Sequence, residues 1–208
     1  SIVNFQGTGS VITVGHGLGS VPDFIILKSR DINSSQWGTY HSSLGATKST
    51  YLNSSNLAAT NSVFFNNTEP TNSVFTIGTW SDMNTSSKDT IAYCFSNVEG
   101  YSKFGSYTGN GSSDETFVYT GFRPAWLMIK SYDQTRNWTI FDNKRTPFNL
   151  MDGHLHANAS VAEQTGEDEI DFLSNGFKFR SGDADSNYSN FNYIYLAFAD
   201  QPFKYSNA

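Results

Sequence analysis

The sequence has little charge, one cysteine and no long apolar run. Asp, Glu, Lys and Arg make up 15% of the 208 residues, against about 25% in a typical globular protein. The 13 basic residues are scattered along the chain and outnumbered by 19 acidic ones, so the clustered cations on which nucleic-acid binding depends are missing. No apolar run approaches the ~20 residues of a membrane helix. We therefore expect neither a nucleic-acid partner nor membrane insertion.

The single cysteine, Cys94, lies in the apolar run 91–95. An intrachain disulfide is impossible, and a buried free thiol is expected. Phosphate loops, dinucleotide fingerprints and nucleophile elbows are also missing, and we expect no cofactor. The chain does contain 38% hydrophobic and 15% aromatic residues, enough for a core, and many Asn, Ser and Thr. A surface of neutral hydrogen-bonding groups suits contact with solvent or sugar.

The most informative feature is that the chain repeats itself. The run from Gly7 to Asp31 returns from Gly109 to Asp133, 102 residues later. Ordered identities at a near-constant offset indicate a duplicated unit, and we expect domains at 1–104 and 105–208. The matched residues are Gly9 and Gly111, Ser10 and Ser112, Pro22 and Pro124, Lys28 and Lys130, Trp37 and Trp138, Phe75 and Phe177, and Phe95 and Phe198.

Each copy has the pattern of β structure. Short apolar or alternating runs are separated by Gly-, Asn- and Ser-rich spans at intervals of roughly ten residues, which is typical of a sandwich or barrel. Helical turns are expected at most at 55–61 and 159–164. The expected fold is all-β, with two tandem β-sandwich repeats of jelly-roll or lectin-like type packed together. Whether the copies form two sandwiches or interleave into one stays open. The expected strands lie at 24–27, 74–79, 126–129, 177–180 and 194–198.

Several runs carry a resemblance to a known family. The segments VYTGFRPAWLMIK, LSNGFKFR and IYLAFADQPFKY, with GLGSVPDFIILKSRD near the start, together resemble a domain of tail-fibre and other virion-associated proteins of marine phages, chiefly those that infect cyanobacteria. The resemblance implies a place on the extracellular face of the virion, a part in host attachment and a homo-oligomer such as a trimer. The implied partners are other phage tail proteins and a bacterial surface polysaccharide or other host receptor. It brings no known binding residues.

We therefore expect a non-catalytic module that binds a surface glycan. The alternatives are a purely structural spacer or decoration of the fibre and, third, a polysaccharide depolymerase. Trp37 and Trp138 recur between the copies and are assigned to packing. Trp80 has Gly182 as its counterpart, and Tyr188 lies in the matching loop. Loop features that differ between copies are where binding would be placed on a shared scaffold.

Covering a neighbouring loop or a subunit contact is an equally open interpretation of these rings. The candidate glycan-binding residues are Trp80, Asp82, Asn84, Asp185, Asn187 and Tyr188.

Two patterns suggest metal sites. Asp183, Asp185 and Asn187 resemble the start of a calcium loop, but the glycine and the closing glutamate of such loops are missing, so a solvated hairpin is the preferred interpretation. His154 and His156 could face a metal from one strand, yet no further ligand stands nearby in the sequence. We expect no metal.

One pattern suggests catalysis. Glu169 and Asp171 match two of the three acidic places on a strand of retaining glucanases, which need two carboxyl groups about 5–5.5 Å apart. The third place holds Leu173 or Ser174, so the proton donor is missing. An acidic edge strand is the preferred interpretation, and no enzyme is expected.

Overall fold

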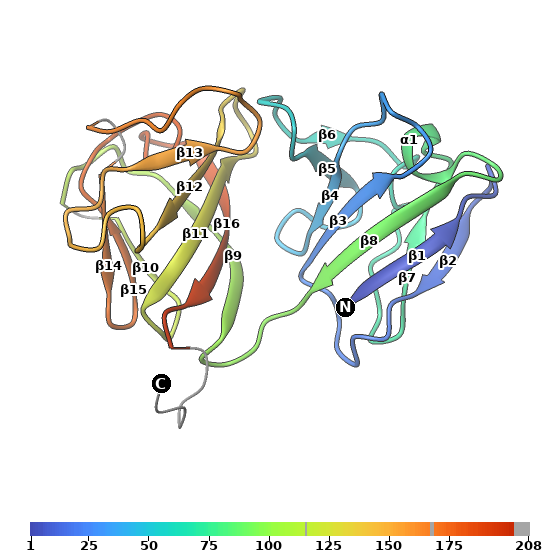
Figure 1. Ribbon diagram of the computed structural model, residues 1–208, viewed down its shortest axis with the longest axis horizontal. Helices are drawn as coiled ribbons and strands as arrows, with labels where there is room; N and C mark the ends of the chain where they lie inside the picture. Colours follow the sequence, from blue (N-terminus) through green and yellow to red (C-terminus); the bar gives the residue numbers. More distant parts are fainter. Residues whose placement is uncertain (115, 167–168, 202–208) are drawn as a thin grey trace. The chain divides into compact units, whose positions relative to one another are not determined.

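The computed structural model describes residues 1–114, 116–166 and 169–201. It divides the chain into two compact units. The first unit comprises Ser1–Asn53 and Ala58–Ser96, and the second comprises Ser54–Leu57 and the chain from Asn97 onward. Apart from the four-residue helix α1 (Ser81–Asn84), the regular structure in the described part of the chain is β, as Figure 1 shows. The prediction of an all-β, sandwich-like fold is confirmed.

The first unit contains a six-stranded antiparallel sheet in the order β1-β8-β3-β4-β5-β6 and a two-stranded sheet of β2 and β7. The strands are β1 (Ile2–Gln6), β2 (Ile12–Gly15), β3 (Phe24–Ser29), β4 (Gly38–His41), β5 (Lys48–Tyr51), β6 (Ala59–Thr60), β7 (Val74–Ile77) and β8 (Asp89–Phe95).

The second unit contains a five-stranded sheet in the order β13-β12-β11-β16-β9 and a three-stranded sheet in the order β10-β15-β14. The strands are β9 (Ser102–Thr108), β10 (Phe117–Tyr119), β11 (Pro124–Ser131), β12 (Trp138–Asp142), β13 (His154–His156), β14 (Ile170–Leu173), β15 (Gly176–Phe179) and β16 (Asn192–Ala199).

The two units share one topology. Read from the other edge, β9-β16-β11-β12-β13 repeats β1-β8-β3-β4-β5, and the pair β10-β15 repeats β2-β7. Each copy therefore builds both of its own sheets, and every strand pair among the described residues stays within one unit. The predicted boundary after Phe104 falls inside β9, which is the counterpart of β1, so the second unit begins earlier than predicted.

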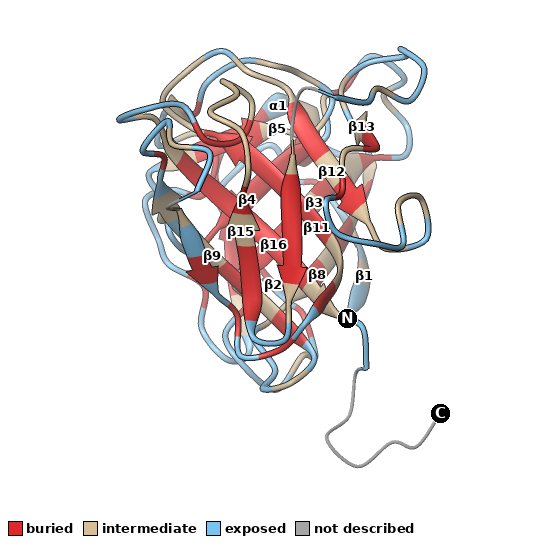
Figure 2. Cartoon of the chain, turned by 90° about the vertical axis from the view of Figure 1, so that its left-hand side faces the viewer, coloured by how far each residue is buried: buried red, intermediate tan, exposed pale blue. Residues whose placement is uncertain are grey.

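The core of each unit lies between its two sheets. In the first unit, Phe75 and Ile77 of the smaller sheet pack with Ile25 and Leu27 of the larger one. In the second unit, the corresponding layer joins side chains of β10, β14 and β15 to those of β11 and β16. Figure 2 shows β11, β15 and β16 as largely buried and most connecting loops as exposed. Along β8 of the first unit, buried and partly buried positions alternate, as the two-residue period of β structure requires.

Some local predictions are wrong. The segments 55–61 and 159–164 form no helical turn, because their backbone groups pair with neighbouring strands: Ala59 with Ser49, and Gln164 with His154. Trp138 is fully buried as predicted, but its counterpart Trp37 is 38% exposed and lies 6.0 Å from the ammonium group of Lys28. Among the described residues, no helix has the length and apolar character needed to cross a membrane.

Cys94 is buried, as predicted, and this burial raises the pKa of its thiol to about 11. The thiolate is the reactive form, so at pH 8 only about one thiol in a thousand is ionised. We expect iodoacetamide to leave the native protein unmodified over hours and to alkylate it completely in guanidinium chloride, as measured by mass spectrometry. Native modification at the rate of a free cysteine would contradict the buried assignment.

Candidate functional site

Trp80 belongs to the core of the first unit. Its side chain is 5% exposed, and its ring packs edge-on against Phe64 with centroids 4.6 Å apart and lies 5.9 Å from Tyr51. Gly38 of β4 makes room for it, since a Cβ there would lie 1.9 Å from the Trp80 ring. The prediction that Trp80 is an exposed sugar-binding residue is therefore wrong.

Asn84 is a buried structural residue. Its side-chain amide donates to the carbonyl oxygens of Ser10 and Gly78, both at 2.6 Å, and its Oδ1 accepts the backbone N–H of Thr8 at 2.8 Å. The side chain thus ties the loop after β1 to the turn before β8. A fully partnered, buried amide is unable to bind sugar as well, so this candidate residue is also wrong.

Asn187 repeats the same contacts in the second unit. Its amide donates to the carbonyl oxygens of Ser112 and Ser181, both at 2.9 Å, and its Oδ1 accepts the backbone N–H of Asn110 at 3.3 Å. It is 0% exposed. Because the whole network recurs, both asparagines serve the shared scaffold.

Asp82 and Asp185 also play matching roles. Asp82 accepts the backbone N–H of Gln36 at 3.1 Å, and Asp185 accepts the backbone and side-chain N–H groups of Asn137 at 3.2 and 2.8 Å. These carboxylates hold the segment before β4 or β12. Asp185 additionally lines the pocket described below.

The turns that carry these residues show which positions correspond. The carbonyl oxygen of Trp80 accepts the N–H of Asn84 at 2.7 Å, and that of Asp183 accepts the N–H of Asn187 at 2.7 Å. Trp80 therefore corresponds to Asp183 and not to Gly182, the residue matched to it by sequence. The sheet register gives a second correspondence, because Gly38 lies opposite Tyr51 and Thr139, its counterpart, lies opposite His156.

A polar pocket of about 220 Å³ opens in the second unit. Its walls come from the segment before β12, from β13, from the strand-like segment beside β13 and from the turn after β15. We call it the polar pocket. Its lining residues are Arg136, Asn137, His154, His156, Gln164, Asp183, Ala184 and Asp185.

The polar pocket exists because two aromatic residues of the first copy are replaced in the second. Trp80 and Tyr51 fill this place in the first unit with packed rings. Their counterparts Asp183 and His156 are smaller and polar, and both line the pocket. The same scaffold is thus closed in one copy and open in the other.

Three polar atoms at or beside this pocket are buried and have no hydrogen-bond partner among the described residues: Nε of Arg136, Nδ1 of His156 and Oγ1 of Thr139. His156 Nε2 lies 2.7 Å from the amide oxygen of Gln164. An oxygen of this kind can only accept, so Nε2 carries the hydrogen and a neutral ring leaves Nδ1 as an acceptor. Buried polar groups normally have partners, which marks this place as suited to a polar ligand.

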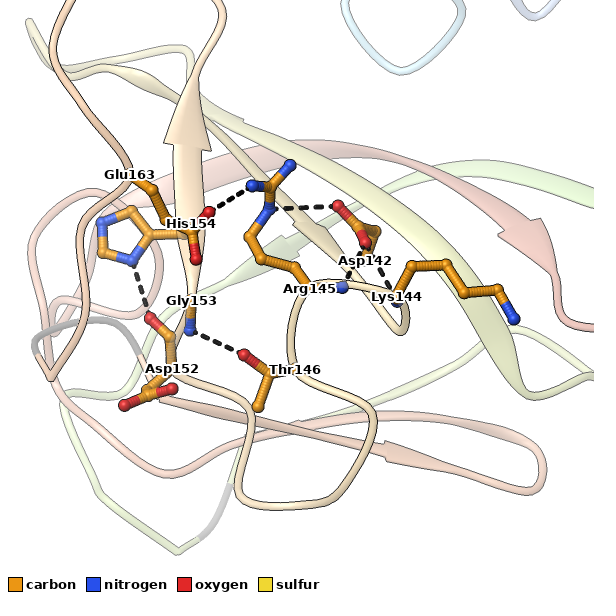
Figure 3. Close-up of polar contacts among 8 residues, drawn as sticks. All are labelled: Asp142, Lys144, Arg145, Thr146, Asp152, Gly153, His154 and Glu163. Carbon is orange, nitrogen blue, oxygen red and sulfur yellow. Dashed lines mark hydrogen bonds and ion pairs between the residues drawn. The ribbon is translucent and has the colours of Figure 1, made fainter.

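The loop between β12 and β13 holds one wall of the pocket in place (Figure 3). Arg145 pairs with Asp142 at 3.2 Å and also with Glu163. Glu163 immediately precedes Gln164, whose backbone exchanges two hydrogen bonds with that of His154, each at 3.0 Å. The ring of His154 lies 5.2 Å from that of His156. The imidazole and amide groups of the wall are therefore preorganised.

The side chains of Asp183, Asp185 and Asn187, considered as candidate metal ligands, do not converge. The carboxylate of Asp183 accepts the backbone N–H of Asp185 at 2.7 Å, Asn187 is buried in its own network, and Asp185 is bound to Asn137. Over residues 1–114, 116–166 and 169–201, no group of three or more His, Cys, Asp or Glu side chains could hold a metal ion.

The carboxylate pair that resembles a glucanase strand has structural contacts. Asp171 of β14 is 7% exposed and forms a salt bridge with Arg180 at 2.6 Å. Arg180 also pairs with Asp114. The backbone N–H of Glu169 donates to Ser181 Oγ at 3.2 Å. The acidic residue Asp171 on this strand is therefore explained by its ion pair with Arg180.

Sequence reasoning missed Arg136, Gln164 and the joint role of the two histidines. A comparison of the copies with the correct offset would have singled out His156 and Asp183, because it matches these polar residues to the Tyr51 and Trp80 rings; it gives no such signal for Arg136 or Gln164. Of the predicted glycan-binding residues, Asp185 lines the pocket and Tyr188 is 49% exposed at the surface; Asp183, named only as a candidate metal ligand, also lines the pocket.

Comparison with protein families matches residues 1–202 to a family described as a domain of unknown function, DUF7483. No curated protein and no solved structure shows significant similarity to the chain.

Exchange of Gly38 for alanine tests the origin of the pocket. We expect Gly38→Ala to lower the free energy of unfolding by about 1–3 kcal/mol, because the added Cβ collides with the Trp80 ring. The control is Thr139→Ala at the matching place of the second unit, which should cost less than about 1 kcal/mol. Urea denaturation measures both, and equal losses would contradict the correspondence.

The two buried asparagines give a second test. Asn84→Ala and Asn187→Ala each remove the side-chain partner of three backbone groups, so each should destabilise the protein by about 1–3 kcal/mol. The exposed Asn72→Ala should be neutral. If Asn187→Ala kept full stability in denaturant titrations, the structural role assigned to it would be wrong.

Proposed function

We propose that the protein is a non-catalytic module that binds a neutral sugar residue of a bacterial surface glycan. The chain belongs to the DUF7483 family, whose description names no activity, so the proposal is based on the geometry of the polar pocket. The observation that carries this proposal is the replacement of the Trp80 and Tyr51 rings by Asp183 and His156. A purely structural spacer would have no use for an open, polar second copy. The volume of about 220 Å³ lies below the range of drug-sized sites and suits one sugar ring or terminal group.

The chemistry of the pocket matches hydroxyl groups. Among the residues that line the pocket, Arg136 supplies donors, and Asp183 and Asp185 supply carboxylate acceptors; Arg136 Nε and His156 Nδ1 are buried and lack a partner within the described part of the chain. A hydroxyl both donates and accepts, so neighbouring sugar hydroxyls can satisfy groups of both kinds. Two carboxylates, those of Asp183 and Asp185, and one guanidinium, that of Arg136, line the pocket. This excess of negative charge disfavours an acidic sugar, and we expect neutral residues to be preferred.

The biological setting follows from the resemblance to virion-associated domains. We propose that the module lies on the tail fibre, at the extracellular face of the virion, and assists attachment to a host polysaccharide. A single small pocket binds weakly. Several copies in a homo-oligomer, such as a trimer, would raise the overall affinity through effective concentration.

A glycan array tests this function. It should carry neutral hexoses, N-acetylhexosamines, hexuronic acids, their linear oligomers, and bacterial capsular and lipopolysaccharide fragments. We expect the wild-type protein to bind at least one neutral glycan. Ala184→Phe, which fills the pocket, should weaken binding by at least about tenfold, whereas the matched Ser81→Phe on the exposed turn of the first unit should leave it unchanged.

Three outcomes would contradict the proposal. The absence of any bound glycan would favour the structural spacer. Equal binding by Ala184→Phe and the wild type would place the site elsewhere. Release of reducing sugar from a bound polysaccharide would show that the module is an enzyme.

A further inference from the structure

An exposed tyrosine, Tyr188, and a partly buried phenylalanine, Phe191, lie beside the polar pocket. The ring of Tyr188 packs on that of Phe191 with centroids 4.7 Å apart, and the guanidinium of Arg136 lies 5.8 Å from the centroid of Phe191. Arg136 also lines the polar pocket. We call Tyr188 and Phe191 the aromatic ledge. It is connected to the pocket through one shared side chain.

The aromatic ledge is held on a rigid turn. The N–H of Tyr188 donates to the hydroxyl of Tyr193 at 3.0 Å, and the N–H of Phe191 donates to the carbonyl of Tyr188 at 3.1 Å. The carbonyl of Phe191 accepts the N–H of Gly109 at 2.8 Å. A Cβ at Gly109 would lie 2.4 Å from the carbonyl oxygen of Tyr188, so only glycine permits this close approach. The ring positions are therefore set by the backbone.

The first unit has the same turn without the aromatic ledge. There the N–H of Lys88 donates to the carbonyl of Thr85 at 3.1 Å, and the carbonyl of Lys88 accepts the N–H of Gly7 at 2.8 Å. Thr85 and Lys88 are thus the counterparts of Tyr188 and Phe191. The second copy differs from the first both in the polar pocket and in the aromatic ledge. Arg136 belongs to both places, because it lines the pocket and lies beside Phe191.

Exposure of a single aromatic side chain is ordinary and would carry no inference. The aromatic ledge differs because it adjoins a polar pocket that contains buried, unpartnered hydrogen-bonding atoms. An aromatic face next to polar groups suits a sugar, whose ring has an apolar C–H face and a polar edge. Phe191 lies next to Arg136, and Tyr188 packs on Phe191, so a sugar chain that leaves the pocket on the side of Arg136 runs toward the aromatic ledge.

We propose that the aromatic ledge is a second sugar subsite, so that the protein recognises a linear oligosaccharide of at least two residues, with one ring in the polar pocket and its neighbour stacked on Tyr188. This inference rests on the proposed function of the pocket. It defines the ligand as an internal or terminal stretch of a polysaccharide and excludes a free monosaccharide as the preferred ligand.

Titration calorimetry with methyl glycosides of glucose, galactose and mannose and with their linear di- and trisaccharides tests the second subsite. The wild-type protein should bind the best disaccharide about five- to tenfold more tightly than the matching monosaccharide, the gain expected for one stacked ring. Tyr188→Ala should abolish this gain and leave the monosaccharide affinity unchanged. Tyr188→Phe, which keeps the ring, should retain the gain.

Tyr119→Ala is the matched control, because Tyr119 is an exposed tyrosine of the same unit, on β10, with 64% of its side chain exposed. It should change neither affinity. Pocket-dependent binding with equal affinity for mono- and disaccharides would overturn the second subsite and leave the proposed function intact. Loss of monosaccharide binding in Tyr188→Ala, with an unchanged circular dichroism spectrum, would also overturn it. Absence of binding to every sugar would refute both proposals.

Discussion

The buried asparagine network is the interaction on which the geometry of both units depends. Asn84 and Asn187 each bind three backbone groups and so join the loop after the first strand to the turn before the last one. Satisfied buried amides hold a unique arrangement, because any shift leaves polar groups unpaired. The turn that precedes the last strand therefore keeps its backbone conformation in both units, although its first residue is Trp80 in one and Asp183 in the other. This is why Trp80 and Asp183 start the same turn with opposite effects on the interior.

The second unit gives up packing that the first unit retains. Trp80 and Tyr51 contribute buried aromatic surface and ring contacts in the first unit, whereas Arg136 and His156 leave buried polar atoms without partners among the described residues. Each such atom costs about 1–3 kcal/mol when nothing binds it. Local features that reduce stability in this way concentrate at functional sites. A bound hydroxyl group would recover part of the lost energy.

Much of the fold could be predicted from the sequence, because strand patterns are local. The alternation around Phe177 and the apolar run at 126–129 predict β15 and β11, and the identities between copies predict two units of one topology. The site could not be predicted in the same way. The burial of Trp80 depends on Gly38 in a distant strand, and the role of Asn187 depends on carbonyl groups from two other segments. A one-residue change of offset before these turns also hid the correspondence of Trp80 with Asp183.

In this duplicated protein, a specialised site should differ between the two copies. A difference alone, however, does not identify such a site. Trp80 differs from its counterpart because the first copy is the filled one, and the proposed binding position is its smaller counterpart, Asp183. A difference becomes informative when it replaces packed rings by polar residues that line a pocket, as His156 and Asp183 do, and leaves a buried polar atom without a partner in the described chain, as at His156 Nδ1. By this criterion, the position of the aromatic ledge beside the polar pocket supports its proposed role. Its exposed ring, Tyr188, packs on the partly buried Phe191, and Phe191 in turn lies 5.8 Å from the guanidinium of Arg136, which lines the pocket.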